Sequence, residues 1–79
     1  MTLDRDAELR HLNEADAHIA DAERRIAKQE AILEKLRQDG HDTNEGQRLL
    51  QAFQETLEAM RRHRVEIFDT LARIDADLN

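Results

Sequence analysis

Apolar residues in the second half of the chain recur with the seven-residue spacing of packed helices. Each heptad holds one seam residue at position a and another, three residues later, at position d. Residues 44–78 are therefore predicted to form one long helix that buries a narrow apolar seam. The only charged residue in this seam is Arg64. The seam consists of Leu50, Leu57, Arg64, Leu71 and Leu78 at a, and of Phe53, Met60, Ile67 and Ile74 at d.

The first half repeats this pattern with smaller side chains. Residues 3–39 are predicted to form a second long helix, and Thr2, Asp4 and Asp6 near its start are suited to capping it. Gln29 is the polar exception in its seam. Position a holds Leu12, Ile19, Ile26 and Leu33, and position d holds Ala15, Ala22, Gln29 and Leu36.

A polar turn at residues 40–43 separates the two predicted helices. Gly40 suits the left-handed position just past a helix end, and Asp42 or Thr43 suits the cap of the next helix. Gly46 lowers helix propensity in the first turn by about 1 kcal/mol, which predicts fraying there. The fold expected for residues 1–79 is a single all-α domain, an antiparallel two-helix coiled-coil hairpin.

The two seams also predict a register. Folding the chain about Thr43 pairs residues whose numbers sum to 86, so that a positions of one helix face d positions of the other. Ile26 is then expected to face Met60, and Ile19 to face Ile67. The same register sets three flanking pairs side by side: Glu23 with Arg61, His11 with Asp77, and Arg25 with His63.

Apolar residues beside the seam predict an association surface. Leu9 and Phe68 lie at e near the open end, Val65 lies at b next to Phe68, and Ile32 and Leu49 lie at g near the turn. A chain of 79 residues buries little surface alone, so two hairpins are expected to form a homodimeric four-helix bundle. We expect Phe68 to help hold the hairpins together. The alternatives are that this surface receives another helical protein, or that it is ordinary scattered surface.

Composition narrows the function classes. The chain has no Cys, which excludes disulfides and thiolate metal sites. It also has no Trp or Tyr, and 38% of its residues are charged, with a net charge of −6. No apolar run approaches the roughly 18 residues of a membrane span, and the start does not read as a signal peptide, so a cytoplasmic location is expected. Without a phosphate loop or a catalytic triad pattern, the prediction is a non-catalytic oligomerisation or interaction module that has no cofactor.

Two ligand-binding alternatives remain. Glu8 and His11 have the Glu-x-x-His spacing of di-iron bundles. His11, Glu14 and His18 share one face of the predicted helix, which would be either a metal-binding face or an ordinary solvated polar surface. A basic waist between acidic ends predicts a phosphate or nucleic-acid patch, although the overall acidity and the lack of stacking aromatics argue against nucleic acid. An antiparallel partner that sets acidic ends against basic waists explains the same layout. The waist consists of Arg24, Arg25, Lys28, Arg61, Arg62 and Arg64.

Four stretches resemble a group of short uncharacterised bacterial helical-hairpin proteins. They are residues 11–16 (His-Leu-Asn-Glu-Ala-Asp), 22–26 (Ala-Glu-Arg-Arg-Ile), 40–43 (Gly-His-Asp-Thr) and 53–57 (Phe-Gln-Glu-Thr-Leu). The resemblance covers most of the chain, and the Gly-His-Asp-Thr turn is its most distinctive part. It carries no known activity, so it transfers no functional residue, and it implies a bacterial, free-standing protein.

Overall fold

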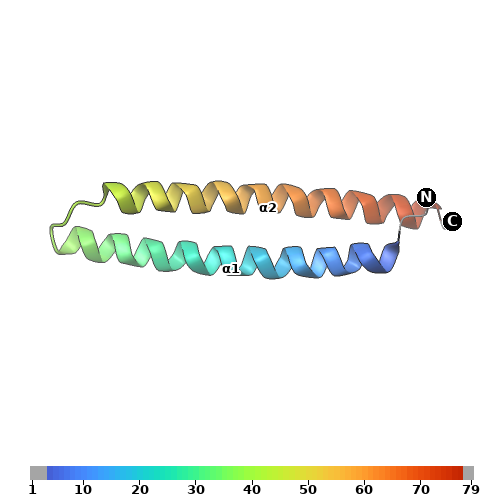
Figure 1. Cartoon of the computed structure of the whole chain (residues 1–79), viewed down its shortest axis with the longest axis horizontal. Helices are drawn as coiled ribbons and strands as arrows, with labels where there is room; N and C mark the ends of the chain where they lie inside the picture. The colour runs from blue at the N-terminus through green and yellow to red at the C-terminus, as the bar shows by residue number, and fades with distance from the viewer. Residues whose placement is uncertain (1–3, 78–79) are drawn as a thin grey trace.

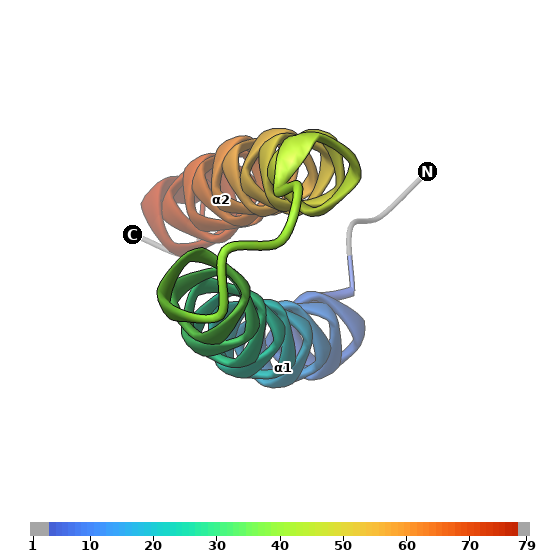
Figure 2. The same ribbon diagram turned by 90° about the vertical axis from the view of Figure 1, so that its left-hand side faces the viewer.

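A computed structural model describes residues 4–77, which form two long helices joined by a short turn. Helix α1 spans Arg5–Gln38 and helix α2 spans Asn44–Asp77. The helices run antiparallel and lie side by side along their whole length (Figure 1), and the view from the turn shows that they form one layer (Figure 2). The all-α hairpin predicted from the sequence is confirmed. The predicted helix ends at residues 3 and 78 lie outside the described residues.

The buried side chains are those of the predicted seam. Within residues 4–77 eight residues are buried; all of them lie at predicted a or d positions, and each keeps between 4% and 9% of its surface exposed. The buried cluster near the open end is extended by Leu9 and Leu12, which are half-buried against it. The other half of the seam is less well covered, and Ile19, Ile26, Phe53 and Met60 remain half-exposed. The buried residues are Ala15, Ala22, Gln29, Leu33, Leu57, Ile67, Leu71 and Ile74.

The end of α1 is closed by Gly40. Its φ of 76° is in the left-handed region, as its place after the helix predicts. The Gly40 N–H donates to the Arg37 carbonyl at 3.1 Å, and the His41 N–H donates to the Leu36 carbonyl at 2.9 Å. These are the two hydrogen bonds of a Schellman motif, which satisfy carbonyls that the helix leaves unpaired.

The start of α2 is capped from the turn. The Asn44 N–H donates to Asp42 Oδ1 at 2.9 Å, which confirms Asp42 as a capping residue. Thr43 contributes through its hydroxyl, which accepts from the Gln47 side-chain amide at 2.9 Å. The side chain that reaches back to the start of the helix is therefore that of Gln47. At the other end of the chain, Asp4 Oδ1 accepts from the Asp6 N–H and caps α1.

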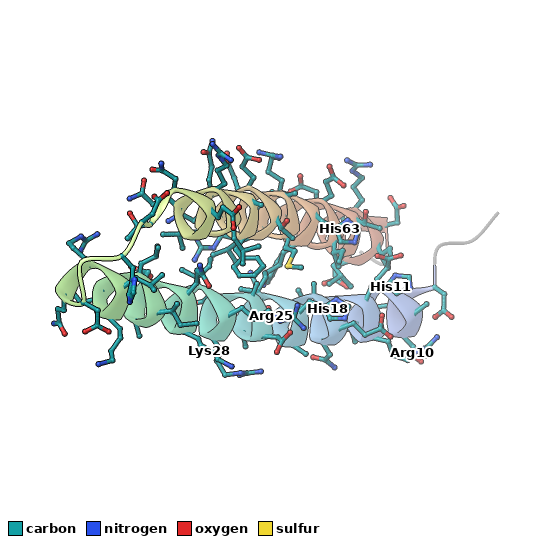
Figure 3. The ribbon with its side chains drawn as sticks, turned by 60° about the vertical axis from the view of Figure 1, so that its left-hand side comes forward. Arg10, His11, His18, Arg25, Lys28 and His63 are labelled. Carbon is teal, nitrogen blue, oxygen red and sulfur yellow. The ribbon has the colours of Figure 1, made fainter. Side chains whose placement is uncertain are left out.

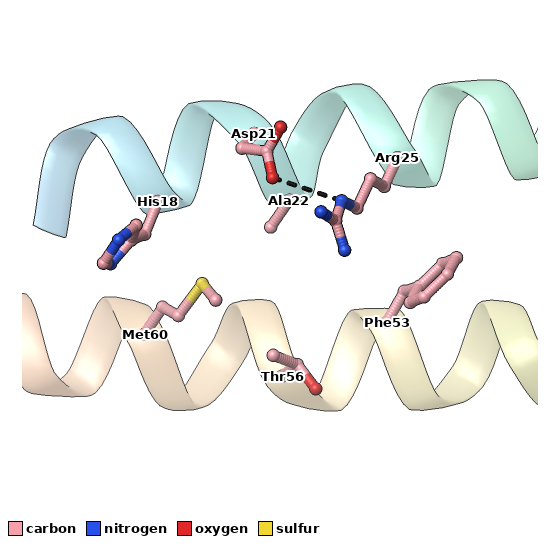
Figure 4. A pocket seen from close by; sticks show the side chains of 7 residues that line it. All are labelled: His18, Asp21, Ala22, Arg25, Phe53, Thr56 and Met60. Carbon is pink, nitrogen blue, oxygen red and sulfur yellow. Dashed lines mark ion pairs between the residues drawn. The ribbon is translucent and has the colours of Figure 1, made fainter.

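The register differs from the prediction by about one heptad. Arg5 Nε lies 2.9 Å from Asp75 Oδ1, and Arg64 Nε pairs with Asp16 Oδ1, so facing residues sum to about 80. Figure 4 likewise shows His18 opposite Met60 and Ala22 opposite Thr56, pairs that sum to 78. The pairing that sums to 86 is therefore wrong. A shift of seven residues leaves every seam residue opposite a seam residue, so the heptad pattern alone does not distinguish the two registers.

The shift also removes the three predicted flanking pairs. Three of these residues have a partner in their own helix instead. His11 Nδ1 is 3.5 Å from Glu8 Oε1, and His63 Nδ1 is 3.7 Å from Glu66 Oε2. Arg25 Nε is 3.1 Å from Asp21 Oδ2. Figure 1 shows the cause at the turn, where α1 extends further than α2 before the chain turns back.

Gln29 and Gly46 hold this register in place near the turn. The Gln29 side-chain amide donates to the Gly46 carbonyl at 3.0 Å, which satisfies a polar group that is only 7% exposed. A Cβ on Gly46 would lie 2.5 Å from Leu33 Cδ2 and 3.2 Å from Gln29 Nε2. Gly46 thus lets α2 approach α1 closely, which gives it a packing role that helix propensity does not reveal.

Candidate functional site

The hairpin presents two faces, one on each side of its seam. We call one the groove face, formed by a stripe of α1 residues at g and the matching stripe of α2. We call the other the Phe68 face, formed by residues at e and b. His18 lies on the groove face, and Asp16, two residues earlier, lies on the Phe68 face. Two residues turn about 200° around a helix, so the two faces point in opposite directions. The groove face holds His18, Arg25, Ile32, Leu49, Thr56 and His63, and the Phe68 face holds Leu9, Asp16, Arg61, Val65 and Phe68.

The groove face is hollowed at its centre. A shallow groove of about 220 Å³ runs between the helices, because the small Ala22 side chain leaves space between Phe53 and Met60 (Figure 4). The Asp21–Arg25 ion pair lies on its α1 rim, and Thr56 lies on its α2 rim. Toward the turn the same face carries Ile32, which is 43% exposed, and Leu49, which is 46% exposed. This face therefore offers apolar side chains to a partner both in the groove and near the turn, with the Asp21–Arg25 ion pair along one edge. The groove is lined by His18, Asp21, Ala22, Arg25, Phe53, Thr56 and Met60.

The Phe68 face carries a second hollow, of about 330 Å³, near the open end of the hairpin. The guanidinium carbon of Arg64 stands 4.7 Å from the centroid of the Phe68 ring, and Arg64 also pairs with Asp16 across the helices. The one charged seam residue therefore leaves the seam and covers part of the exposed ring. Phe68 remains 46% exposed and Val65 is 57% exposed. Leu9 contributes less than predicted, because it is half-buried against the core.

The five predicted association residues therefore do not form one surface. Ile32 and Leu49 lie on the groove face, whereas Leu9, Val65 and Phe68 lie on the Phe68 face. Sequence reasoning assigned the correct heptad positions but did not use the fact that e and g flank opposite sides of the seam. It also missed Phe53, Met60 and Ala22 as groove residues, because seam positions were expected to be fully covered by the second helix.

The histidine-rich flank is not arranged as a metal site. Figure 3 shows His11, His18 and His63 toward the end of the hairpin remote from the turn. Within residues 4–77, no group of three or more His, Cys, Asp or Glu side chains is placed to hold a metal ion. His11 instead lies beside Glu8, the other member of the Glu-x-x-His spacing. The metal alternative has no geometric support in this part of the chain.

Ion pairs reduce the positive charge of the basic waist. Asp21 pairs with both Arg24 and Arg25, at 3.5 Å and 3.1 Å. Arg62 Nη1 lies 3.1 Å from Glu58 Oε1, and Arg64 pairs with Asp16. Four of the six waist cations thus have an acidic partner on the same molecule. A phosphate backbone would have to compete with these carboxylates, so the geometry does not favour nucleic acid over an acidic protein surface.

Comparison of the chain with protein-family models, with curated proteins and with solved structures finds no match. The resemblance to short bacterial hairpin proteins therefore stays a prediction. Along the described residues, neither helix has a stretch apolar enough to cross a membrane. The candidate site accordingly rests on the geometry of the two faces alone.

Proposed function

We propose that this protein is a non-catalytic association module, in which two hairpins pack face to face as a homodimeric four-helix bundle. The observation that carries the proposal is the apolar surface that one hairpin leaves uncovered. Four large apolar side chains are each at least 43% exposed: Ile32, Leu49, Val65 and Phe68. The seam residues Ile19, Ile26, Phe53 and Met60 are half-exposed. Ile32 and Leu49 lie together on one face and Val65 and Phe68 on the other, and exposed apolar groups of this kind are typical of surfaces that bind another protein.

The small core supports the same proposal. Two helices in one layer bury eight side chains, and no described side chain is less than 2% exposed. Below about 70–80 residues, one such core contributes only a few kcal/mol of stability, and oligomerisation is one common way to add more. A second layer of helices would cover one face of each hairpin and complete the burial of the half-exposed seam residues.

Sedimentation equilibrium over a wide range of concentrations tests the proposal. We expect a species of twice the 9.2 kDa chain mass at micromolar concentration, and a midpoint of thermal unfolding that rises with concentration. A mass of one chain at every concentration, with an unfolding midpoint independent of concentration, would contradict self-association. In that case the exposed faces would become candidate surfaces for a helical partner of different sequence.

A further inference from the structure

We infer that the groove face is the dimer interface, and that a second copy of this chain binds it antiparallel, about a two-fold axis that passes near Thr56. The inference rests on the self-association proposed above and selects one of the two faces for it. In this arrangement α2 packs on α2 of the partner subunit and α1 packs on its α1, so the two turns lie at opposite ends of the bundle.

The α2 side of the groove face has no charged residue between Leu49 and His63. Apart from Leu49, its exposed positions carry small residues, which allow a second helix to approach closely. The only polar group in this stretch is the Thr56 hydroxyl, which already donates to the Ala52 carbonyl at 3.0 Å. Burial of the stripe therefore leaves no hydroxyl donor unsatisfied. The stripe consists of Leu49, Ala52, Thr56 and Ala59, with the half-buried Phe53 and Met60 beside it.

The α1 side of the groove face carries a stripe of charges that is complementary to itself when reversed. Glu14, Asp21, Lys28 and Lys35 follow one another at seven-residue intervals, so they lie along one line of the helix. Their order is two acids and then two bases. An antiparallel copy of the same line sets both acids against bases, whereas a parallel copy sets like charges together. Along this line, charge complementarity therefore favours an antiparallel second copy over a parallel one, and Arg25, which the axis sets beside its own copy, is held by Asp21 of its own chain.

The two stripes share one midpoint. The charge pattern on α1 is centred between residues 24 and 25, and the uncharged stripe on α2, from Leu49 to Ala59, is centred on residue 54. Facing residues sum to about 79, so residues 24 and 25 lie opposite residues 54 and 55. A single two-fold axis through this point relates both helices to their copies. Two patterns of different chemistry on different helices therefore indicate the same axis.

The Phe68 face fits a second copy less well. Its charged side chains already pair across the helices, Arg5 with Asp75 and Arg64 with Asp16, and these ion pairs would lose water on association. The Phe68 ring already has the Arg64 guanidinium over it. The charged residues at this face are Arg5, Asp16, Arg61, Arg64 and Asp75.

The length of the groove face is compatible with a dimer. The Cα atoms of the hairpin span 61 × 17 × 15 Å, so either long face has an outline of about 1,000 Å². Standard protein interfaces bury roughly 800 Å² on each partner. An antiparallel copy would therefore have to pack along most of the groove face to reach this size.

Single cysteines test the axis, because the natural chain has none. We expect Thr56→Cys to form a disulfide-linked dimer on mild oxidation, since a residue near a two-fold axis lies close to its own copy. Val65→Cys is the matched control: it is also an exposed position of α2, but it lies on the Phe68 face. We expect Val65→Cys to crosslink at least tenfold more slowly, with both variants sedimenting as the wild type does under reducing conditions.

The outcomes separate this inference from the proposed function. A monomeric wild type contradicts self-association, and with it the choice of face. A dimeric wild type in which Val65→Cys crosslinks as fast as or faster than Thr56→Cys overturns the groove-face interface alone. A dimeric wild type in which neither variant crosslinks overturns the position of the axis.

Charge reversal on α1 gives a second, independent test. Asp21→Lys leaves one acid and three bases on the stripe, and Lys28→Asp leaves three acids and one base. Each variant repels its own copy and attracts the other, so a mixture should form mostly the mixed dimer, as native mass spectrometry would show. A mixed dimer at only the statistical share would overturn the predicted contact between the α1 stripes.

Discussion

The side-chain amide of Gln29 donates to the carbonyl oxygen of Gly46 across the two helices at 3.0 Å. Gln29 is the one polar residue among the eight that are buried, and Gly46 is where α2 approaches α1 closely enough for a Cβ to clash. Moving either helix by a heptad would leave the buried amide without this acceptor, at a cost of about 1–3 kcal/mol. A polar seam residue of this kind specifies register more than it adds stability.

Paired cysteines should confirm the register directly. In the observed pairing Ile26 faces Phe53, so Ile26→Cys with Phe53→Cys is expected to crosslink within one chain on mild oxidation. Ile26→Cys with Met60→Cys places the thiols about 10 Å apart along the helices, because seven residues at the α-helical rise cover that distance. Mass spectrometry after proteolysis distinguishes the two. Preferential crosslinking of the Met60 pair would restore the register that sums to 86.

Gln29→Leu should reduce register specificity while changing stability little. Leucine fits an apolar seam and removes a buried amide, so the free energy of unfolding is expected to change by no more than about 1 kcal/mol. The cysteine pair at positions 26 and 60 should then crosslink detectably beside the pair at 26 and 53. Gln54→Leu, at an exposed position, is the control and should leave the crosslinking pattern unchanged. If Gln29→Leu also leaves it unchanged, the amide does not set the register.

Gly40→Ala should destabilise the hairpin by about 1–2 kcal/mol, because an L side chain at φ 76° clashes with its own backbone. A Cβ at this position would meet no atom of any residue outside 39–41 within 4 Å, so the cost comes only from the backbone conformation. Gly40→Asn should cost less, since asparagine tolerates the left-handed region better. Chemical denaturation of the three proteins measures the order. Equal stability of the alanine and glycine proteins would show that the turn relaxes to another conformation.

Gly46→Ala should also destabilise, but for a different reason. Alanine gains about 1 kcal/mol of helix propensity, and overpacking against Leu33 costs about 1–3 kcal/mol, so a net loss of up to about 2 kcal/mol is expected. In the Leu33→Ala background the same change should become neutral or stabilising, because the clashing Cδ2 is absent. A double-mutant cycle measures this coupling. A coupling energy near zero would mean that α2 moves aside instead.

Leu49→Glu and Phe68→Glu form a matched pair on the two faces, since each side chain is 46% exposed in one hairpin. With the groove face as interface, Leu49→Glu should weaken the dimer by roughly 2 kcal/mol or more, about thirtyfold in dissociation constant. Phe68→Glu should stay dimeric and lose only local packing with Leu9 and Arg64. Sedimentation of both variants decides between the faces. A monomeric Phe68→Glu beside a dimeric Leu49→Glu would return the interface to the Phe68 face, as first expected from the sequence.

The sequence alone determined the secondary structure, the direction of the two helices and the identity of the buried residues. These features depend on short-range chemistry: a 3.5-residue apolar period, a glycine suited to positive φ, and a capping aspartate beside it. All eight buried residues lie at positions that the heptad pattern assigned, even though one of them is Gln29.

Only the tertiary structure decided the register and the contacts that follow from it. A heptad repeat is unchanged by a shift of seven residues, so the choice depended on the path of the turn and on the contacts of Gly46 with Leu33 and Gln29. The same choice brought Arg64 to Asp16 and placed its guanidinium over the Phe68 ring. Both outcomes depend on the relative position of two helices, which no periodicity within one helix contains.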